Sequence, residues 1–344
     1  MKLISFIVPS YNCSSFLEQC VTSLMHPLGK DRLEIIIVND GSTDDTPEAA
    51  EKLQKAYPDY VRVIHQENKG HGGALNTGCA AATGKYLKVI DADDRIVTDS
   101  LPAYLDALEH CDSDVVLTHH FTRDISNGEI KKWRSYPEQF GIACTMDQIM
   151  VCPKNFDRSL TFHGITYRTE FYRQKGIRLS EHVFYEDHEY ATVPCCYASY
   201  VMPLDLFLYD YRIGDVQQSV SDANQLKRLS HMEAVLERFL TEYKRLTLPA
   251  DSAGRAFFEL KAQGVLLSYI TTVMLVEPDR KKGRQLGEAM MERFQKQLPG
   301  AYERAQKQYK IFRVMNRLHV RKATWEKLLQ SGLYRKLRGS HDFT

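Results

Sequence analysis

Three carboxylates lie close together at the end of an apolar run in the first third of the chain. The segment YLKVIDADDR, residues 86–95, is mostly apolar and then brings together Asp91, Asp93 and Asp94. Carboxylates this close repel one another, which raises at least one pKa unless a cation lies between them. Mg²⁺ and Mn²⁺ prefer oxygen ligands and commonly link one or two carboxylates to substrate phosphates. The spacing therefore predicts a divalent metal site; an acidic turn that caps the next helix is the simpler alternative.

The elements that would position these acids form an alternating pattern. Short apolar runs alternate with helical patterns through the first half of the chain, which predicts an α/β fold with a mostly parallel central sheet and flanking helices. The expected strands are 3–9, 33–39, 61–65, 86–91 and 115–118. The expected helices are 15–25, 46–57, 73–82 and 101–109, with Thr46 and Ser100 as N-caps.

Polar residues follow the carboxyl ends of these strands. Ligands of an open parallel sheet bind beyond those ends. The first four strands are followed by PSY, NDGS, QENKG and DADD, so polar chemistry is expected to gather at one edge.

Length and composition indicate two folded units. The chain has 344 residues, of which 43% are apolar and 26% charged, and these values exclude disordered and collagen-like classes. The regular alternation fails after about residue 121, where Asn127 and Gly128 predict a hairpin. From residue 223 the pattern is helical. We therefore expect a catalytic α/β domain over residues 1–222 and a helical C-terminal domain over residues 223–344.

Positive charge is concentrated at the C-terminal end. The net charge is +1, but residues 279–344 carry 17 Lys and Arg against 6 Asp and Glu. Apolar stripes lie opposite these basic residues, as in helices that rest on anionic membrane surfaces. Helices that pack on the first domain or form a homo-oligomer would show the same periodicity, and a solvated helical face is a further alternative. These alternatives stay open.

Cysteine usage and hydropathy favour a cytoplasmic protein. The eight cysteines form no Cys-x-x-Cys motif, and no zinc-type spacing to histidine is present. The chain begins with a strand pattern and no signal-peptide layout, and no apolar run reaches the length of a membrane span. We expect a cytoplasmic location, with at most peripheral attachment to the inner face of the cell membrane.

Five segments together resemble family 2 glycosyltransferases of the GT-A fold, from the N-terminus to about residue 221. They are FIVPSYNCSSFLEQCVTSL, EIIIVNDGSTDDT, NKGHGGALNTGCAAATGKYLKVIDADD, FYEDHEY and YDYRIGDVQQSVS. The resemblance implies an inverting, metal-dependent enzyme that transfers a sugar from a nucleotide sugar, with UDP favoured, to an acceptor hydroxyl. The implied metal is Mn²⁺ or Mg²⁺. The implied acceptor is a saccharide or a lipid-linked sugar, in the synthesis of cell-surface polysaccharide or glycolipid, and no nucleic acid is expected as a partner.

The resemblance also implies the residues that bind the donor. Pro9 and Tyr11 would receive the nucleotide base, although Pro9 could simply end the first strand. Asp40 would accept a hydrogen bond from the uracil ring. Asp93 would contact the metal, Asp91 the metal or the ribose, and Asp94 the sugar hydroxyls.

One position departs from the family pattern. Many relatives carry Arg before Asn76, facing the donor phosphates, but this chain has Leu75. His71, Asn76, Lys69 or backbone amides at the helix start could replace that arginine, because helix N-termini attract phosphate. A core role for His71 is the alternative. Asn68, on the same loop, is also assigned to donor binding.

Lys88 is unusual because it lies in the middle of an expected buried strand. A buried lysine needs a partner, and we predict that Lys88 joins the donor site by pairing with Asp40. A surface lysine on an exposed strand edge is the alternative.

The remaining assignments concern the reaction. In the family that the chain resembles, the second acid of Glu-Asp is the general base, which implies this role for Asp187 and a supporting role for Glu186. Favourable charge in the first turn of a helix is the simpler explanation. Arg212 and the residues 217–219 resemble a loop that closes over the donor, although Arg212 could instead form a structural salt bridge.

Two other functions remain as alternatives. A sugar-phosphate nucleotidyltransferase also combines an α/β domain with acidic metal ligands, but PSYNCSS lacks the glycine-rich basic loop expected after its first strand. A catalytically silent nucleotide-sugar-binding assembly protein is the other alternative, and the retention of both Asp93 and Asp187 argues against it.

Overall fold

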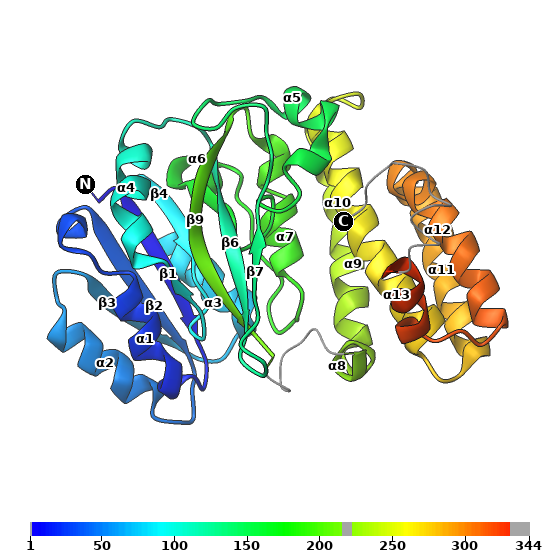
Figure 1. Ribbon diagram of the computed structural model, residues 1–344, viewed down its shortest axis with the longest axis horizontal. Helices are drawn as coiled ribbons and strands as arrows, with labels where there is room; N and C mark the ends of the chain where they lie inside the picture. Colours follow the sequence, from blue (N-terminus) through cyan, green and yellow to red (C-terminus); the bar gives the residue numbers. More distant parts are fainter. Residues whose placement is uncertain (1, 215–221, 331–344) are drawn as a thin grey trace. The chain divides into compact units, whose positions relative to one another are not determined.

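A computed structural model describes residues 2–214 and 222–330 of the chain (Figure 1). The chain forms two compact units. The first contains Met1–Gln218 and the later segment Leu246–Phe258, and the second contains Ser219–Arg245 and Glu259–Thr344. This return of a later segment to the first unit is not anticipated by a single boundary near residue 222.

The first unit is built on a mixed sheet. The strand order among the described residues is β3-β2-β1-β4-β8-β6-β9-β5, and β7 pairs with β6. Strands β1 to β4 run parallel, as do β6 and β9, whereas β5, β7 and β8 are antiparallel to their neighbours. The strands are β1 Ile4–Ser10, β2 Leu33–Asp40, β3 Val61–Gln66, β4 Tyr86–Val89, β5 Arg95–Ile96, β6 Val115–Asp124, β7 Ile130–Trp133, β8 Ile165–Arg168 and β9 Val201–Ile213.

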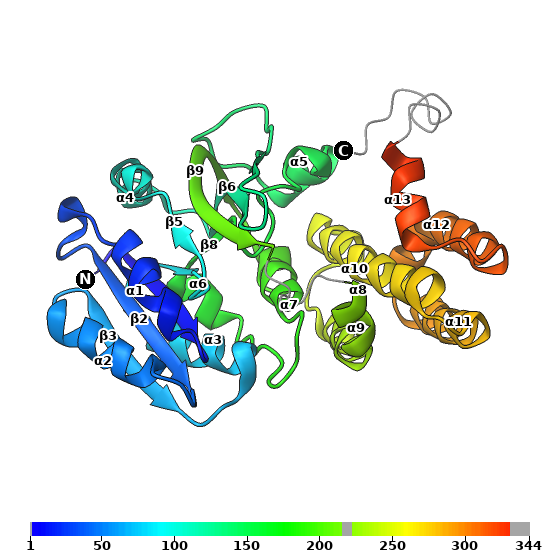
Figure 2. The same cartoon turned by 60° about the horizontal axis from the view of Figure 1, so that its bottom comes forward.

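Helices accompany this sheet as the sequence pattern predicts. Figure 2 shows α1 and α2 beside the end of the sheet that carries β1, β2 and β3. Strands β1 and β2 are buried along their whole length, which explains why their central residues are apolar. Near their starts, the hydroxyl of Ser5 donates a hydrogen bond to Glu34 Oε1 at 2.6 Å. The α-helices of the first unit before residue 214 are α1 Ser14–Ser23, α2 Thr46–Ala56, α3 Gly70–Ala81, α4 Leu101–Glu109, α5 Met146–Val151, α6 Thr169–Gln174 and α7 Asp187–Thr192. Short 3₁₀ helices lie at Pro27–Gly29, Thr98–Ser100, Pro153–Asn155 and Cys195–Tyr197.

The start of α2 differs slightly from the prediction. Thr46 is the first helical residue and not the cap, because the preceding Asp45 takes that position. The Thr46 hydroxyl accepts a hydrogen bond from the backbone of Cys13, and its own N–H donates to the Asp44 carboxylate. Ser100 does precede α4, but its side chain makes no capping hydrogen bond.

Strand β6 is longer than the sequence predicts. The expected strand ends at residue 118, whereas β6 continues to Asp124. Its second half pairs with β9 on one side and with β7 on the other, so polar residues such as His119 and Thr122 are buried by their neighbours. The predicted hairpin between β6 and β7 is confirmed, and Gly128 takes a φ of 75° at its turn.

The described part of the second unit is helical, as predicted for the C-terminal region. Its helices are α8 Asp222–Lys227, α9 Leu229–Arg245, α10 Ala253–Thr271, a π-helix Thr272–Val276, α11 Arg280–Gln297, α12 Pro299–Arg317 and α13 Lys322–Gln330, with the start of α10 in the first unit.

Part of the predicted apolar stripe packs within this unit. The Phe312 and Trp325 rings meet edge to face, with their centroids 5.7 Å apart. The stripe predicted from the sequence also includes Leu328, Leu329 and Leu337, but Leu337 and the side chains of Leu328 and Leu329 lie outside the described residues. None of the described helices is long and apolar enough to cross a membrane.

Candidate functional site

The acidic loop after β4 is anchored to strand β9 through Asp94. The two oxygens of the buried Asp94 carboxylate accept from the Tyr209 hydroxyl and from the Arg212 N–H, each at 2.7 Å. The Tyr209 hydroxyl also accepts from the Asp91 N–H, at 3.1 Å. Burial, followed by the charges of Asp91 and Asp93, raises the pKa of Asp94 well above its usual range. Asp94 therefore has a structural role in shaping this loop, beside the predicted role in sugar binding.

Asp93 is exposed at the tip of the same loop. Partial desolvation and then the charge of Asp91 raise the pKa of Asp93 to about 6. A cation between these two carboxylates would relieve that repulsion, so the pair fits a hard divalent metal. Among the described residues there is no group of three or more His, Cys, Asp or Glu side chains arranged to hold a metal by themselves. A cation held by one or two carboxylates together with substrate phosphates does not need such a group.

His71 joins this loop to the second acidic segment. Its Nε2 lies 3.0 Å from Asp91 Oδ1, and its Nδ1 lies 2.5 Å from Glu186 Oε1. Glu186 is almost completely buried. Burial alone would lower the pKa of His71, but the charge of Asp91 and the hydrogen bonds to both acids outweigh burial and raise it well above its usual value. One imidazole thus bridges two acids that are far apart in the sequence.

Asp187, the predicted base, is the first residue of α7 and is half-buried. The pKa of Tyr211 in β9 is affected by the charges of nearby acids. Burial raises the pKa of Tyr211, and the charges of Asp94, Asp91, Asp93 and Asp187 raise it further. The acids predicted for the donor side and for the base therefore act on the same phenol.

The residues that are predicted to bind the nucleotide base lie at the ends of β1 and β2. Tyr11 is 52% exposed, whereas Pro9 is buried within β1. Asp40 Oδ1 accepts from Gln66 Nε2 at 2.6 Å and from the Lys69 N–H at 2.9 Å.

Asn68 supports the same loop. Its Nδ2 donates to the Asp40 carbonyl, at 3.0 Å, and its Oδ1 accepts from the Gly70 N–H. Asp40 and Asn68 therefore come together at the end of β2, where nucleotide recognition was expected.

Leu75 and Asn76 both have structural roles. Leu75 is fully buried. Asn76 exchanges two hydrogen bonds with the backbone of Leu179: its Nδ2 donates to the carbonyl at 3.0 Å, and its Oδ1 accepts from the N–H at 2.9 Å. This link was not predictable from the sequence, because the two residues are 103 positions apart.

The predicted pairing of Lys88 with Asp40 is wrong. Lys88 is fully buried, and its Nζ donates to the carbonyls of His163 and Ile165, at 2.8 and 3.1 Å. The partners are backbone oxygens because β4 lies beside β8, and β8 begins at Ile165. Burial lowers the pKa of Lys88 to about 7.

Arg212 lies on the last part of β9. Its guanidinium carbon lies 4.2 Å from the ring centroid of Phe16 in α1, and its backbone supports Asp94. The predicted lid residues Gln217, Gln218 and Ser219 lie outside the described residues.

Sequence reasoning missed Tyr209, whose hydroxyl hydrogen-bonds to Asp91 and Asp94, and Tyr211, whose pKa responds to the same acids. Their signal was the alternation in YDYR, which places both tyrosines on one face of a strand that ends beside Arg212.

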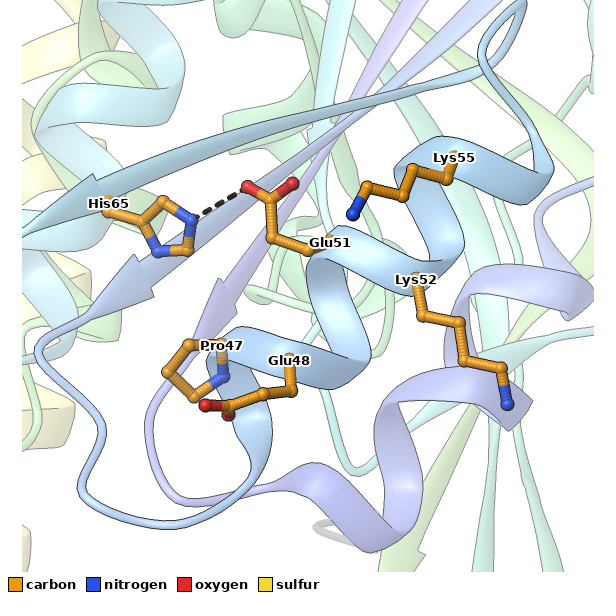
Figure 3. A pocket seen from close by; sticks show the side chains of 6 residues that line it. All are labelled: Pro47, Glu48, Glu51, Lys52, Lys55 and His65. Atoms are coloured by element: carbon orange, nitrogen blue, oxygen red, sulfur yellow. Dashed lines mark hydrogen bonds and ion pairs between the residues drawn. The ribbon is translucent and has the colours of Figure 1, made fainter.

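A separate hollow of about 450 Å³ lies on α2 and β3 (Figure 3). In it, His65 Nε2 lies 3.0 Å from Glu51 Oε1. None of the predicted site residues lines this hollow, so it is not part of the candidate site. It is lined by Pro47, Glu48, Glu51, Lys52, Lys55 and His65.

Comparison with known proteins adds independent evidence. Residues 5–172 match the family model described as glycosyl transferase family 2. The chain is 35% identical over 128 residues to the glycosyltransferase GlyG of Streptococcus pneumoniae serotype 4, a match that covers 37% of this chain and 42% of GlyG. The chain thus aligns with less than half of that relative's length.

Solved structures match over most of the chain. Residues 1–349 of S. aureus TarS, in complex with UDP-GlcNAc, give a TM-score of 0.62 at 19% identity, with 93% of each chain covered. The mannosyltransferase PcManGT of Pyrobaculum calidifontis, in complex with GDP-Man and Mn²⁺, gives 0.50 at 19% identity, covering 91% of this chain and 86% of PcManGT. At this level of identity the matches show the fold alone. Residues 5–172 thus form a glycosyl transferase family 2 domain. The structural matches show that the chain adopts the GT-A fold.

Proposed function

We propose that this chain is an inverting, metal-dependent glycosyltransferase that moves a sugar from a UDP-linked donor to an acceptor hydroxyl. The observation that carries the proposal is that His71 contacts both Asp91 and Glu186. This contact supports a single site that contains the predicted donor acids and the segment of the predicted base. The presence of UDP-GlcNAc in the TarS complex supports a UDP sugar as the first donor to test.

The donor side is assigned to the ends of β1, β2 and β4. Asp40 would accept from the uracil ring, and Tyr11 would offer a stacking face to the base. Asp91 and Asp93 would hold Mn²⁺ or Mg²⁺. When bound, such a cation neutralises the diphosphate and assists its departure.

The acceptor side is assigned to the start of α7. Asp187 would take the proton of the acceptor hydroxyl as the oxygen attacks the anomeric carbon. Attack from the face opposite the departing diphosphate inverts the anomeric configuration. A single carboxylate base suffices here, whereas a glycoside hydrolase needs two flanking carboxyl groups. Glu186 would orient the segment through His71.

The acceptor is proposed to be a saccharide or a lipid-linked sugar, in cell-surface polysaccharide or glycolipid synthesis. The basic face of α11 to α13 would then bring the enzyme to the anionic inner surface of the cell membrane. Flotation with anionic liposomes, compared between the full chain and a form that lacks residues 300–344, tests this part. Equal soluble fractions would remove it.

A nucleotide-sugar panel tests the central proposal. UDP and GDP sugars are tested, with and without Mn²⁺, for thermal stabilisation of the protein and for slow release of the nucleoside diphosphate. We expect stabilisation by a UDP sugar that requires the metal.

Two variants separate binding from chemistry. Asp93→Asn should lose the metal-dependent stabilisation, and Asp187→Asn should keep it while losing release of UDP. Stabilisation without release in the parent protein, even with a panel of saccharide acceptors, would favour a silent binding protein. Release of pyrophosphate from a nucleoside triphosphate and a sugar phosphate would favour a nucleotidyltransferase.

A further inference from the structure

The segment that carries the predicted general base is hydrogen-bonded to the start of α3 at several positions. Asn76 makes two hydrogen bonds with the backbone of Leu179. The His182 N–H donates to the Lys69 carbonyl at 2.8 Å. His71 reaches Glu186, which directly precedes Asp187. Residues 179–187 are thus held along their length by a helix that lies more than 90 positions earlier in the chain.

Glycines at the start of α3 make this close approach feasible. A Cβ atom on Gly72 would lie 2.2 Å from the Ser180 carbonyl oxygen and 3.0 Å from Glu186 Cγ. A Cβ atom on Gly70 would lie 2.8 Å from the His182 backbone nitrogen, and Gly70 also has a φ of 74°. Neither position has room for a side chain. The glycine-rich sequence is therefore explained by contact with another part of the same chain.

The base segment is also braced from its own helix. The buried Glu189 of α7 accepts from the Ser180 N–H at 2.9 Å and from the Ser180 hydroxyl at 2.7 Å. Residues 180 and 189 are therefore joined by two hydrogen bonds. Because of this link, the contacts with α3 hold the whole loop in place and not just one side chain.

We propose that the start of α3, Gly70–Asn76, is a mount for the base segment 179–187, with His71 and Asn76 as positioning residues. They set the Asp187 carboxylate relative to Asp91 and Asp93, and Asn76 does not contact the donor diphosphate. This inference deepens the proposed function and rests on it. It replaces the expectation that Asn76 substitutes for the arginine missing at Leu75.

The expected effect follows from the geometry of catalysis. A reacting group that is misplaced by about 1 Å can lose on the order of a hundredfold in rate. Loosening the base segment should therefore lower turnover by about ten- to a hundredfold. Donor affinity should change little, because Asp40, Asp91 and Asp93 do not depend on Asn76.

The test compares two variants of the full chain. Asn76→Ala removes both bonds to Leu179 and touches neither Asp91 nor Glu186. Arg173→Ala is the matched control, because Arg173 also ties α3 to a distant segment: it donates from α6 to the carbonyls of Ala80 and Ala82 at the other end of α3. For each protein, the Kd of UDP with Mn²⁺ is measured by calorimetry, and turnover is measured as UDP released from the UDP sugar that the parent hydrolyses.

The proposal expects a split between these two quantities. Asn76→Ala should keep the UDP affinity within about twofold while turnover falls at least tenfold, and Arg173→Ala should change neither. Equal losses of affinity and turnover in Asn76→Ala would mean that Asn76 binds the donor, and unchanged turnover would mean that the mount does not position the base. Either result overturns the proposal.

Hydrogen exchange separates this inference from the proposed function. In the parent, amides of residues 179–187 should be protected, and Asn76→Ala should lose that protection while Arg173→Ala keeps it. If the parent neither binds UDP nor releases it, the proposed function fails, whatever the exchange shows. If the parent is active but Asn76→Ala keeps both turnover and protection, only the mount is refuted.

Discussion

Lys88 offers a quantitative test of how the first unit is built. Burial lowers the pKa of its ammonium from 10.5 to about 7. Between these two pH values the unfolded chain binds a proton that the folded chain has released. The free energy of unfolding therefore rises with pH across this window. A shift of this size corresponds to about 5 kcal/mol over the whole window, and to about 2 kcal/mol between pH 7 and pH 9.

Lys88→Met removes this dependence. The substitution leaves the carbonyls of His163 and Ile165 without their donor, which costs about 1–3 kcal/mol for each group. That cost does not vary with pH. The stability of the parent minus that of the variant should therefore increase by about 2 kcal/mol from pH 7 to pH 9.

The two tryptophans make the assay specific. Trp133 lies in the first unit and Trp325 in the second, and the chain has no other tryptophan. In a Trp325→Phe background, urea unfolding followed by fluorescence reports the first unit alone. Lys52→Met, on the exposed side of α2, is the control and should give a constant difference from the parent. If Lys88→Met also gave a constant difference, Lys88 would have an ordinary pKa, and the account of its burial would be wrong.

Three further substitutions test particular contacts. Tyr209→Phe should destabilise the first unit by about 1–3 kcal/mol, because it removes the donor to buried Asp94; Trp133 fluorescence during urea unfolding measures this, and no change would contradict the role of Tyr209. Gly78→Ala would bring a Cβ atom to 2.3 Å from Ile7 Cγ2, so overpacking should cost about 1–3 kcal/mol in the same assay; an unchanged midpoint would show that α3 can move away from β1. Asn316→Ala should destabilise the second unit by about 1–3 kcal/mol, because buried Asn316 donates to the Met274 carbonyl at 2.8 Å; Trp325 fluorescence measures it in a Trp133→Phe background, and equal stability would refute the reasoning.

The central strands were predictable because local pattern and global burial agree there. Strands β1 and β2 are covered on both faces, so their central residues are apolar. The second half of β6 was not predictable in the same way. His119 and His120 interrupt its apolar sequence, and only pairing with β9 and β7 buries them as a strand.

The site shows the same division between local and distant information. The acids Asp91 and Asp93 were recognised from their spacing and their position after a strand. The bridging role of His71 and the two hydrogen bonds of Asn76 depend on partners more than 100 positions away in the sequence. The partner of Lys88 was predicted wrongly for a related reason. Every residue has a backbone carbonyl, so the sequence does not indicate which carbonyls accept a hydrogen bond from Lys88.

The burial of Leu75 limits which side chains this position can hold. An arginine introduced at this fully buried position would place a charge in the core of the first unit without a ready partner. A single Leu75→Arg exchange in this chain should therefore lower the stability of the first unit.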